Sequence, residues 1–177
     1  MWKEISDIEL NVKLYDFLEK IKKIDKRLHV VFWMLYKHGL RINEVLELDR
    51  WNLEKNNQFS IVTEKASEIR KINMAEVAGD YLVFLSNKWA SNKVCSYDVA
   101  KDRFKKYFDT SLYYSDKKRI CTHIFRHNYV KRLIRQGLTD KEVAILMGHK
   151  NEKNTLNYIN SKIYFIPAIQ LAFRLFG

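Results

Sequence analysis

The sequence contains few of the residues that interrupt regular structure, with one proline, Pro167, and five glycines among 177 residues. It also lacks low-complexity segments and internal repeats, so nothing in the chain marks a linker or a domain boundary. A chain of this length buries most of its unfolded surface around a single core. We therefore expect residues 1–177 to form one continuous domain.

Cysteines and long hydrophobic runs are scarce as well. Cys95 and Cys121 form neither a CxxC pair nor part of a cluster of metal ligands, which gives no sign of zinc and predicts reduced thiols in a cytosolic protein. The longest wholly apolar run, residues 30–36, is too short to span a bilayer, and the N-terminus lacks the pattern of a secretion signal. We expect a soluble cytoplasmic protein without a membrane partner.

Acidic residues are fewer than basic ones: the sequence has 21 Asp and Glu and 32 Lys and Arg, which gives a formal net charge of +11. A positive surplus of this size suits a polyanionic partner, and nucleic acid is the leading candidate. The alternative is a basic surface that only contacts solvent. The apolar fraction of 47% and the charged fraction of 30% are those of an ordinary globular protein rather than a disordered chain.

Hydrophobic periodicity predicts a mostly helical chain. Gly39 is placed to end the second helix, and Thr122 and the Thr139–Glu142 capping box are placed to begin two later ones. Residues 58–74 change to short β-favouring runs around a polar turn, which predicts a hairpin and the only sheet. The fold class is therefore α+β, a mostly helical single domain with a small antiparallel sheet. The predicted helices cover residues 8–24, 28–37, 43–50, 77–88, 97–108, 123–136, 140–147, 152–160 and 167–176.

Three short motifs carry side chains suited to a phosphate group. In THIFRHNYVKRL, His123 and Arg126 are three residues apart near a helix start, so both face the same way beside backbone N–H groups that favour an anion. In HGLRINEVLEL, Glu44 can hold the Arg41 guanidinium in a fixed pose for bidentate phosphate contact. Lys65 lies at the turn of the predicted hairpin. Taken singly, such motifs are more often a solvated helix face, a surface ion pair or a turn lysine.

Together, the motifs resemble the signatures of the tyrosine recombinases, also called the phage integrase family. GLRINEVLEL is similar to the first arginine box of that family, HIFRH to its H-x-x-R-H box, and LMGH followed by a tyrosine to its last box. The resemblance extends from about residue 36 to residue 160 and implies the fold of a recombinase catalytic domain. It also implies a catalytic set made of Arg41, Lys65, His123, Arg126, His149 and Tyr158, in which Glu44 would support Arg41 through the contact described above.

The resemblance makes Tyr158 the nucleophile that attacks a DNA phosphate. A tyrosine hydroxyl is almost wholly neutral near neutral pH, so its proton must be accepted as it attacks. His123 is expected to accept that proton or to hold the phosphate, and Lys65 is expected to protonate the departing 5′-oxygen. The implied product is a 3′-phosphotyrosyl bond, which a 5′-hydroxyl of another strand can attack to reseal the backbone.

Two arginines and a histidine are expected to stabilise the reacting phosphate. Arg41 and Arg126 would offset the added negative charge, and His149 would donate a hydrogen bond to a non-bridging oxygen. Gly148 is expected to end a helix so that His149 can face the phosphate. No metal, ATP or other cofactor is expected, because the sequence offers no Walker loop and no carboxylate cluster for Mg²⁺.

Double-stranded DNA and further copies of the chain are the implied partners. Residues 163–177 are expected to include an apolar-faced C-terminal helix that docks on the neighbouring protomer of a synaptic tetramer, with packing on the protein's own core as the alternative. Its apolar face would consist of Ile169, Leu171, Phe173 and Phe176. Side chains on two predicted helices are expected either to contact the DNA backbone or to face solvent only: Lys101, Arg103, Lys105, Lys106, Lys131, Arg132 and Arg135.

One part of the family pattern is missing. Fewer than forty residues precede the first arginine box, whereas family members normally carry an upstream helical domain that closes around the DNA. We therefore expect that clamp domain to be absent from this chain. The sequence predicts a site-specific DNA recombinase; the alternatives are an enzyme like the type IB topoisomerases, which relaxes supercoils, and an integrase-derived DNA-binding module without catalysis.

Overall fold

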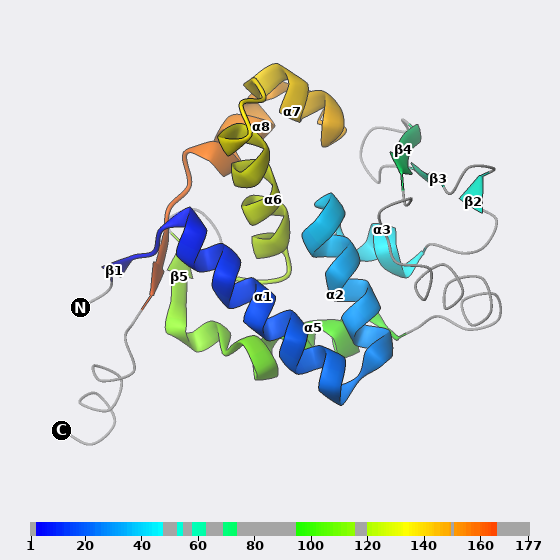
Figure 1. The fold of residues 1–177 in the computed structure, drawn as a ribbon, viewed down its shortest axis with the longest axis vertical. Helices are drawn as coiled ribbons and strands as arrows, with labels where there is room; N and C mark the ends of the chain where they lie inside the picture. Colours follow the sequence, from blue (N-terminus) through cyan, green and yellow to red (C-terminus); the bar gives the residue numbers. More distant parts are fainter. Residues whose placement is uncertain are drawn as a thin grey trace.

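The computed structural model describes residues 3–47, 53–54, 58–62, 69–73, 95–115, 120–149 and 151–165. Lys65 and the predicted helices over residues 77–88 and 167–176 lie outside the described residues. In the described part, helices form the body of the molecule, and two small sheets lie toward its opposite sides (Figure 1). The predicted class, mostly helical with a small antiparallel sheet, is confirmed.

Within the described residues, the elements follow one another in chain order as α-helices, short β-strands and a short 3-10 helix. They are β1 (Lys3–Glu4), α1 (Asp7–Ile24), α2 (Lys26–His38), α3 (Ile42–Leu46), β2 (Leu53–Glu54), β3 (Gln58–Val62), β4 (Ile69–Asn73), α5 (Tyr97–Phe108), η2 (Thr110–Leu112), β5 (Tyr113–Ser115), α6 (His123–Arg135), α7 (Asp140–Leu146), α8 (Glu152–Ile159) and β6 (Ile163–Phe165).

The first two helices meet at a corner that one side chain creates. Asp25 ends α1 and begins α2, because its carboxylate accepts hydrogen bonds from the backbone N–H groups of Arg27 and Leu28. At the other end of α2, Gly39 adopts the left-handed conformation with φ of 61° and stops the helix, as predicted. Arg41 follows two residues later and begins α3. The position at which α2 ends thus fixes the position of Arg41 at the start of α3.

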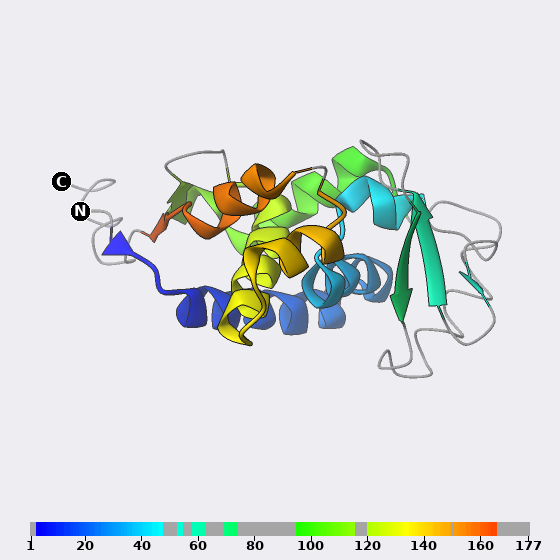
Figure 2. The same ribbon diagram turned by 90° about the horizontal axis from the view of Figure 1, so that it is seen from above.

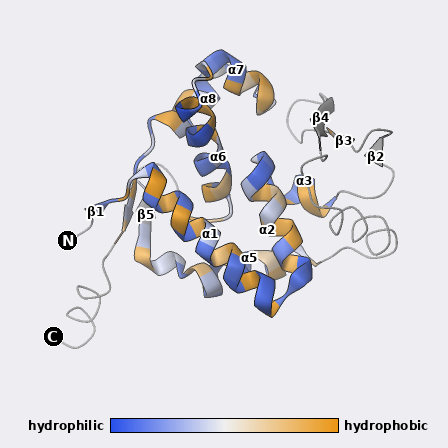
Figure 3. Cartoon of the chain, in the orientation of Figure 1, coloured by the Kyte–Doolittle hydropathy of each residue, from blue (hydrophilic) through white to orange (hydrophobic). Residues whose placement is uncertain are grey.

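An aromatic cluster forms the core between α1, α2, α5 and α6. The Phe17 ring lies 5.0 Å from Phe32, 5.4 Å from Phe104 and 6.0 Å from Phe125, measured between ring centroids. Burying each such ring contributes about 1.5–3 kcal/mol of transfer free energy, so the cluster is a main source of stability. Each helix shows hydrophilic residues beside hydrophobic ones (Figure 3), which is the pattern of helices that cover a core on one face.

Residues 58–62 and 69–73 form the predicted hairpin, in which Phe59 pairs with Ile72, and β2 adds a third strand. The prediction of a single sheet is wrong, because β1, β6 and β5 form a second antiparallel sheet with β6 in its centre. These strands have only two or three residues, which is too short for a recognisable alternating pattern. Residues 163–165, at the start of the expected C-terminal segment, form β6, which the sequence analysis did not predict.

Helix α6 connects the two sides of the molecule, because it packs against α1 and α2 on one side and α8 on the other (Figure 2). The prediction that Thr122 caps α6 is wrong: Thr122 is itself in the helical region with φ of −54°, so its side chain makes no capping bond. The chain enters α6 through a turn in which the Thr122 carbonyl accepts from Phe125 N–H at 3.2 Å. The Thr139–Glu142 capping box of α7 is confirmed.

Candidate active site

A cavity of 420 Å³ lies beside α6 and α8 and reaches the start of α3. Four of the six predicted catalytic residues line it: Arg41, His123, His149 and Tyr158. Arg126 reaches this group through His149, and Lys65 lies outside the described residues. Residues from positions 41 to 158 of the chain therefore meet at one site.

Arg41 is held by the carboxylate of Glu44. Its Nη1 donates to Glu44 Oε1 at 2.7 Å, and its backbone N–H donates to Glu44 Oε2 at 2.7 Å. Both bonds arise locally, because Arg41 precedes α3 and Glu44 is the third residue of that helix. The Glu44 side chain is 1% exposed and that of Arg41 15% exposed, so the pair is shielded from water and the guanidinium is restrained at the cavity wall.

Arg126 is almost completely buried, at 1% exposure, and joins three segments of the chain. Its Nη1 donates to the Gly39 carbonyl at 2.7 Å, and its Nη2 donates to the Met147 carbonyl at 2.6 Å. Nη2 also lies 3.0 Å from His149 Nε2. His123 lines the cavity, whereas Arg126 is not among the lining residues and contacts the lining residue His149.

The end of α7 orients His149. Gly148 has φ of 60°, the His149 N–H donates to the Ala144 carbonyl, and the Gly148 N–H donates to the Ile145 carbonyl. This is the Schellman arrangement, so Gly148 ends α7 and turns His149 toward the cavity, as predicted. The imidazole stacks on the Tyr158 ring, with centroids 5.7 Å apart and planes within 5°.

The hydrogen bonds of His149 also decide its tautomer. A guanidinium has only donors, so His149 Nε2 accepts from Arg126, and the proton lies on Nδ1, 2.7 Å from Thr155 Oγ1. In this state Nε2 cannot donate to a phosphate oxygen, which differs from the predicted role of His149. Donation from Nε2 requires a proton on that nitrogen, and the Arg126 N–H group must also move away, because two donors cannot face each other at 3.0 Å.

Among the cavity-lining residues that the sequence analysis did not single out are His127 and Ser161. His127 is 6% exposed, and its Nδ1 lies 2.9 Å from Ser161 Oγ, which in turn donates to the Tyr158 carbonyl at 3.1 Å. His127 is the last residue of the HIFRH motif, and Ser161 is three residues beyond the tyrosine. These positions in the sequence could have pointed to His127 and Ser161 as site residues, but a serine after a helix is too common to indicate a function.

Residues 9–163 match the sequence pattern that describes the phage integrase family. The chain belongs to this family. It is similar to the tyrosine recombinases XerC of Rickettsia peacockii (strain Rustic), with 24% identity over 173 residues, and of Rickettsia rickettsii (strain Sheila Smith), with 25%. Each alignment covers 92% of this chain and 56% of the relative. The integrase-family chain thus spans about half the length of the curated relatives it matches.

Solved structures of recombinases share the fold. The catalytic domain of bacteriophage HP1 integrase has a TM-score of 0.63 at 15% identity, covering 93% of this chain and 91% of that one. The XerA recombinase has a TM-score of 0.62 at 15% identity, covering 99% of this chain and 64% of that one. The XerH site-specific recombinase, bound to palindromic difH substrate, has a TM-score of 0.64 at 16% identity, covering 98% and 52%. The fold of the integrase-family catalytic domain is therefore present here.

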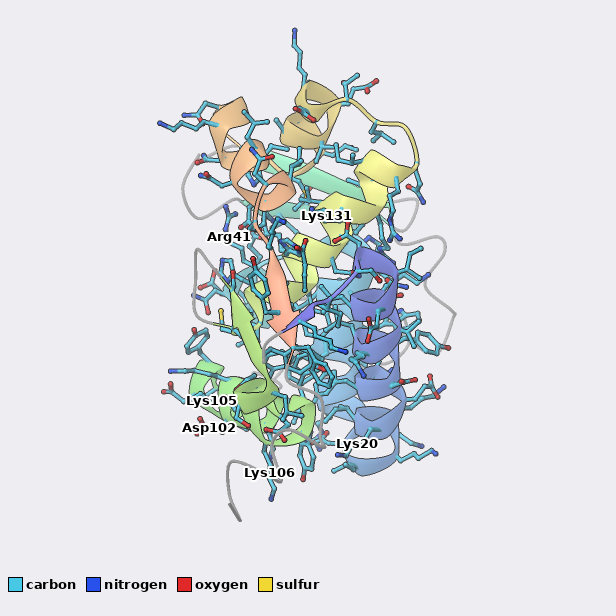
Figure 4. The ribbon with its side chains drawn as sticks, turned by 90° about the vertical axis from the view of Figure 1, so that its left-hand side faces the viewer. Lys20, Arg41, Asp102, Lys105, Lys106 and Lys131 are labelled. Carbon is cyan, nitrogen blue, oxygen red and sulfur yellow. The ribbon has the colours of Figure 1, made fainter. Side chains whose placement is uncertain are left out.

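The basic residues of α5 lie apart from the cavity. Lys105 and Lys106 are at one end of the molecule, well separated from Arg41 (Figure 4). Arg103 and Lys106 flank the Tyr107 ring at 6.0 and 5.4 Å from its centroid. Lys101 lies 5.9 Å from the Tyr97 ring centroid. The structure therefore does not bring these predicted DNA-contacting residues together with the catalytic group.

The basic residues of α6 differ from one another. Arg132 donates to the Tyr36 carbonyl and lies over the Tyr36 ring, 4.4 Å from its centroid, and burial lowers the pKa of its guanidinium. Lys131 lies 3.8 Å from the Asp7 carboxylate. Arg135 is exposed. Arg132 therefore holds α6 against α2, a role that its prediction as a DNA contact did not include.

In the part of the chain that the structure describes, no helix combines the length and the hydrophobicity that crossing a bilayer requires. Within the same residues, no three histidine, cysteine, aspartate or glutamate side chains gather as metal ligands.

Proposed function

We propose that this integrase-family chain is the catalytic part of a site-specific DNA recombinase that cleaves and rejoins strands through Tyr158. The observation that carries the proposal is the cavity itself, which is lined by a tyrosine, three histidines and a restrained arginine. Such a group suits attack on a phosphodiester, because cations and N–H donors can offset the charge that the phosphate gains in the transition state. Family membership supports the same reaction.

Cleavage begins when the Tyr158 oxygen attacks the phosphorus of one DNA strand. The phenolic proton passes to His123, the P–O5′ bond breaks, and the leaving 5′-oxygen takes a proton from Lys65. A 3′-phosphotyrosyl bond to Tyr158 and a free 5′-hydroxyl result. Arg41, which Glu44 restrains, contacts the non-bridging oxygens during this step.

Rejoining reverses these bonds with a different strand. A 5′-hydroxyl from the partner duplex attacks the phosphotyrosyl phosphorus and gives its proton to the neutral Lys65 amine. The bond from phosphorus to the Tyr158 oxygen breaks, and His123 returns a proton to that oxygen. One phosphodiester is broken and one is formed, so the exchange requires no ATP and no metal in this mechanism. Exchange between two duplexes needs several copies of the chain, so we propose that it acts as a homo-oligomer on double-stranded DNA, with four protomers in the synaptic complex.

Covalent capture tests the proposal. The 177-residue chain is mixed with nicked duplexes that contain the DNA flanking its gene, the reaction is stopped with SDS, and adducts are separated by electrophoresis. Wild type and Tyr129→Phe, which alters a tyrosine on α6, should form an SDS-resistant adduct, and Tyr158→Phe should form none. Peptide mass mapping should locate the nucleotide on Tyr158.

The possible outcomes distinguish a recombinase from a topoisomerase-like enzyme and from a DNA-binding module without catalysis. Absence of an adduct on duplexes that the chain binds in a gel-shift assay would contradict catalysis and leave a DNA-binding module. An adduct accompanied by relaxation of supercoiled plasmid without any joint product between two sites would favour topoisomerase-like activity. Joint molecules that require Tyr158 would support recombination.

A further inference from the structure

Besides the packing of α8 on α6, Ser161 links the carboxyl end of α8 to α6 by hydrogen bonds. Ser161 Oγ donates its only proton to the Tyr158 carbonyl at 3.1 Å. The same oxygen lies 2.9 Å from His127 Nδ1, so it must accept that bond from the Nδ1 proton. The result is a directed chain of hydrogen bonds from His127 through Ser161 to the backbone of Tyr158.

Helix α8 needs such an attachment. It has eight residues, a length at which an isolated helix is unstable, and its last carbonyls have no partner within the helix. Ser161 satisfies the Tyr158 carbonyl, and His127 is 6% exposed on α6, the helix that also carries His123 and Arg126. The attachment therefore relates the tyrosine to two other members of the catalytic group.

We propose that Ser161 and His127 are positioning residues for the nucleophile, an inference that rests on the proposed role of Tyr158. The phenolic oxygen lies at the far end of a long side chain, so a small rotation of α8 moves it by a larger distance. Misplacing a reacting atom by about 1 Å can reduce a rate roughly 100-fold. The His127–Ser161 chain opposes that rotation directly at the residue that bears the nucleophile.

Single-turnover cleavage of a saturating nicked duplex tests this role, because it separates the chemical step from DNA binding. Ser161→Ala and His127→Leu should each lower the first-order rate of adduct formation by about tenfold, equal to roughly one hydrogen bond. The Kd for DNA should stay within about twofold of wild type, since neither side chain is assigned a contact with the phosphates. Ser111→Ala, which removes an exposed hydroxyl on η2, is the matched control and should match wild type.

Rescue distinguishes positioning from general stability. The Nδ2 of asparagine can replace the imidazole Nδ1 as the donor, so His127→Asn should retain a rate within about threefold of wild type. The double variant Ser161→Ala/His127→Leu should lose no more than the larger single effect, because both changes break one chain. A wild-type rate for Ser161→Ala, additive losses, or equal losses in His127→Asn and His127→Leu would overturn the inference.

Hydrogen exchange provides a readout that does not need cleavage. Ser161→Ala should accelerate exchange of the Asn160 amide, which donates to Leu156 at the end of α8, without changing amides in α1. If wild type forms no adduct, the proposed function fails, but exchange of the Asn160 amide still tests whether Ser161 and His127 hold the end of α8. Unchanged exchange at Asn160 would contradict the attachment itself.

Discussion

Replacing Gly39 with alanine should destabilise the protein and disturb Arg126. Gly39 has φ of 61°, a conformation that costs a residue with a Cβ about 1–2 kcal/mol. An added Cβ would lie 2.4 Å from Tyr129 Cδ1 and 3.1 Å from Met147 Cε, contacts that require packed atoms to move. Overpacking of this kind costs about 1–3 kcal/mol, so the free energy of unfolding should fall by roughly 2–5 kcal/mol in total.

Gly137→Ala is the control for the backbone contribution alone. Gly137 also has positive φ, 93°, but no heavy atom lies within 4 Å of its ideal Cβ. Urea denaturation of both variants should therefore show a larger loss for Gly39→Ala, by about 1–3 kcal/mol. For a chain of this size, each kcal/mol corresponds to a decrease in Tm of about 2–4 °C.

The effect on catalysis follows from the hydrogen bonds at the same place. The Gly39 carbonyl accepts from Arg126 Nη1, and Met147, which the new Cβ would press against, supplies the carbonyl for Nη2. Adduct formation by Gly39→Ala, measured where both variants are fully folded, should therefore fall about tenfold to 100-fold below Gly137→Ala. Equal stability losses and equal rates in the two variants would refute the reasoning.

Other parts of the structure allow further tests. Arg132→Met should lower the free energy of unfolding by about 1–3 kcal/mol, because Arg132 contacts the carbonyl and the ring of Tyr36. For the same reason this change should leave the salt dependence of DNA binding unchanged. Arg135→Ala, which alters an exposed residue, should not change the free energy of unfolding. The two hydrogen bonds from Thr139 lower the pKa of the Glu142 carboxyl. Glu142 therefore stabilises the fold at pH values above the ordinary pKa of glutamate, and this contribution is lost as the pH falls through the lowered pKa. The stability difference between wild type and Glu142→Gln should therefore shrink in acid, and an unchanged difference would contradict this linkage. Deletion of residues 167–177 should reduce the size of DNA-bound assemblies in light scattering, because the C-terminal helix is expected to dock on the neighbouring protomer. An unchanged size would contradict this docking.

Local signals explain why much of the helical framework could be predicted. Helix α5 begins and ends at the predicted residues, 97 and 108, because Ser96 accepts from Val99 N–H and apolar residues recur at helical spacing. The Arg41–Glu44 contact also lies within three residues of sequence. Thr122 shows the limit of such reasoning, since a residue of the capping type adopted helical φ and ψ and could not cap.

The sequence by itself determined the family signatures, most helix positions and the catalytic candidates, because caps, periodicity and motif spacing act over a few residues. Only the tertiary structure decided how the candidates meet. Arg126 reaches a carbonyl 87 residues away, and His127 bonds Ser161 across 34 residues. The tautomer of His149 and the β1–β6–β5 sheet depend on such distant partners as well. Long-range contacts leave no periodic or local pattern in a single sequence, because they arise only when separate helices pack together.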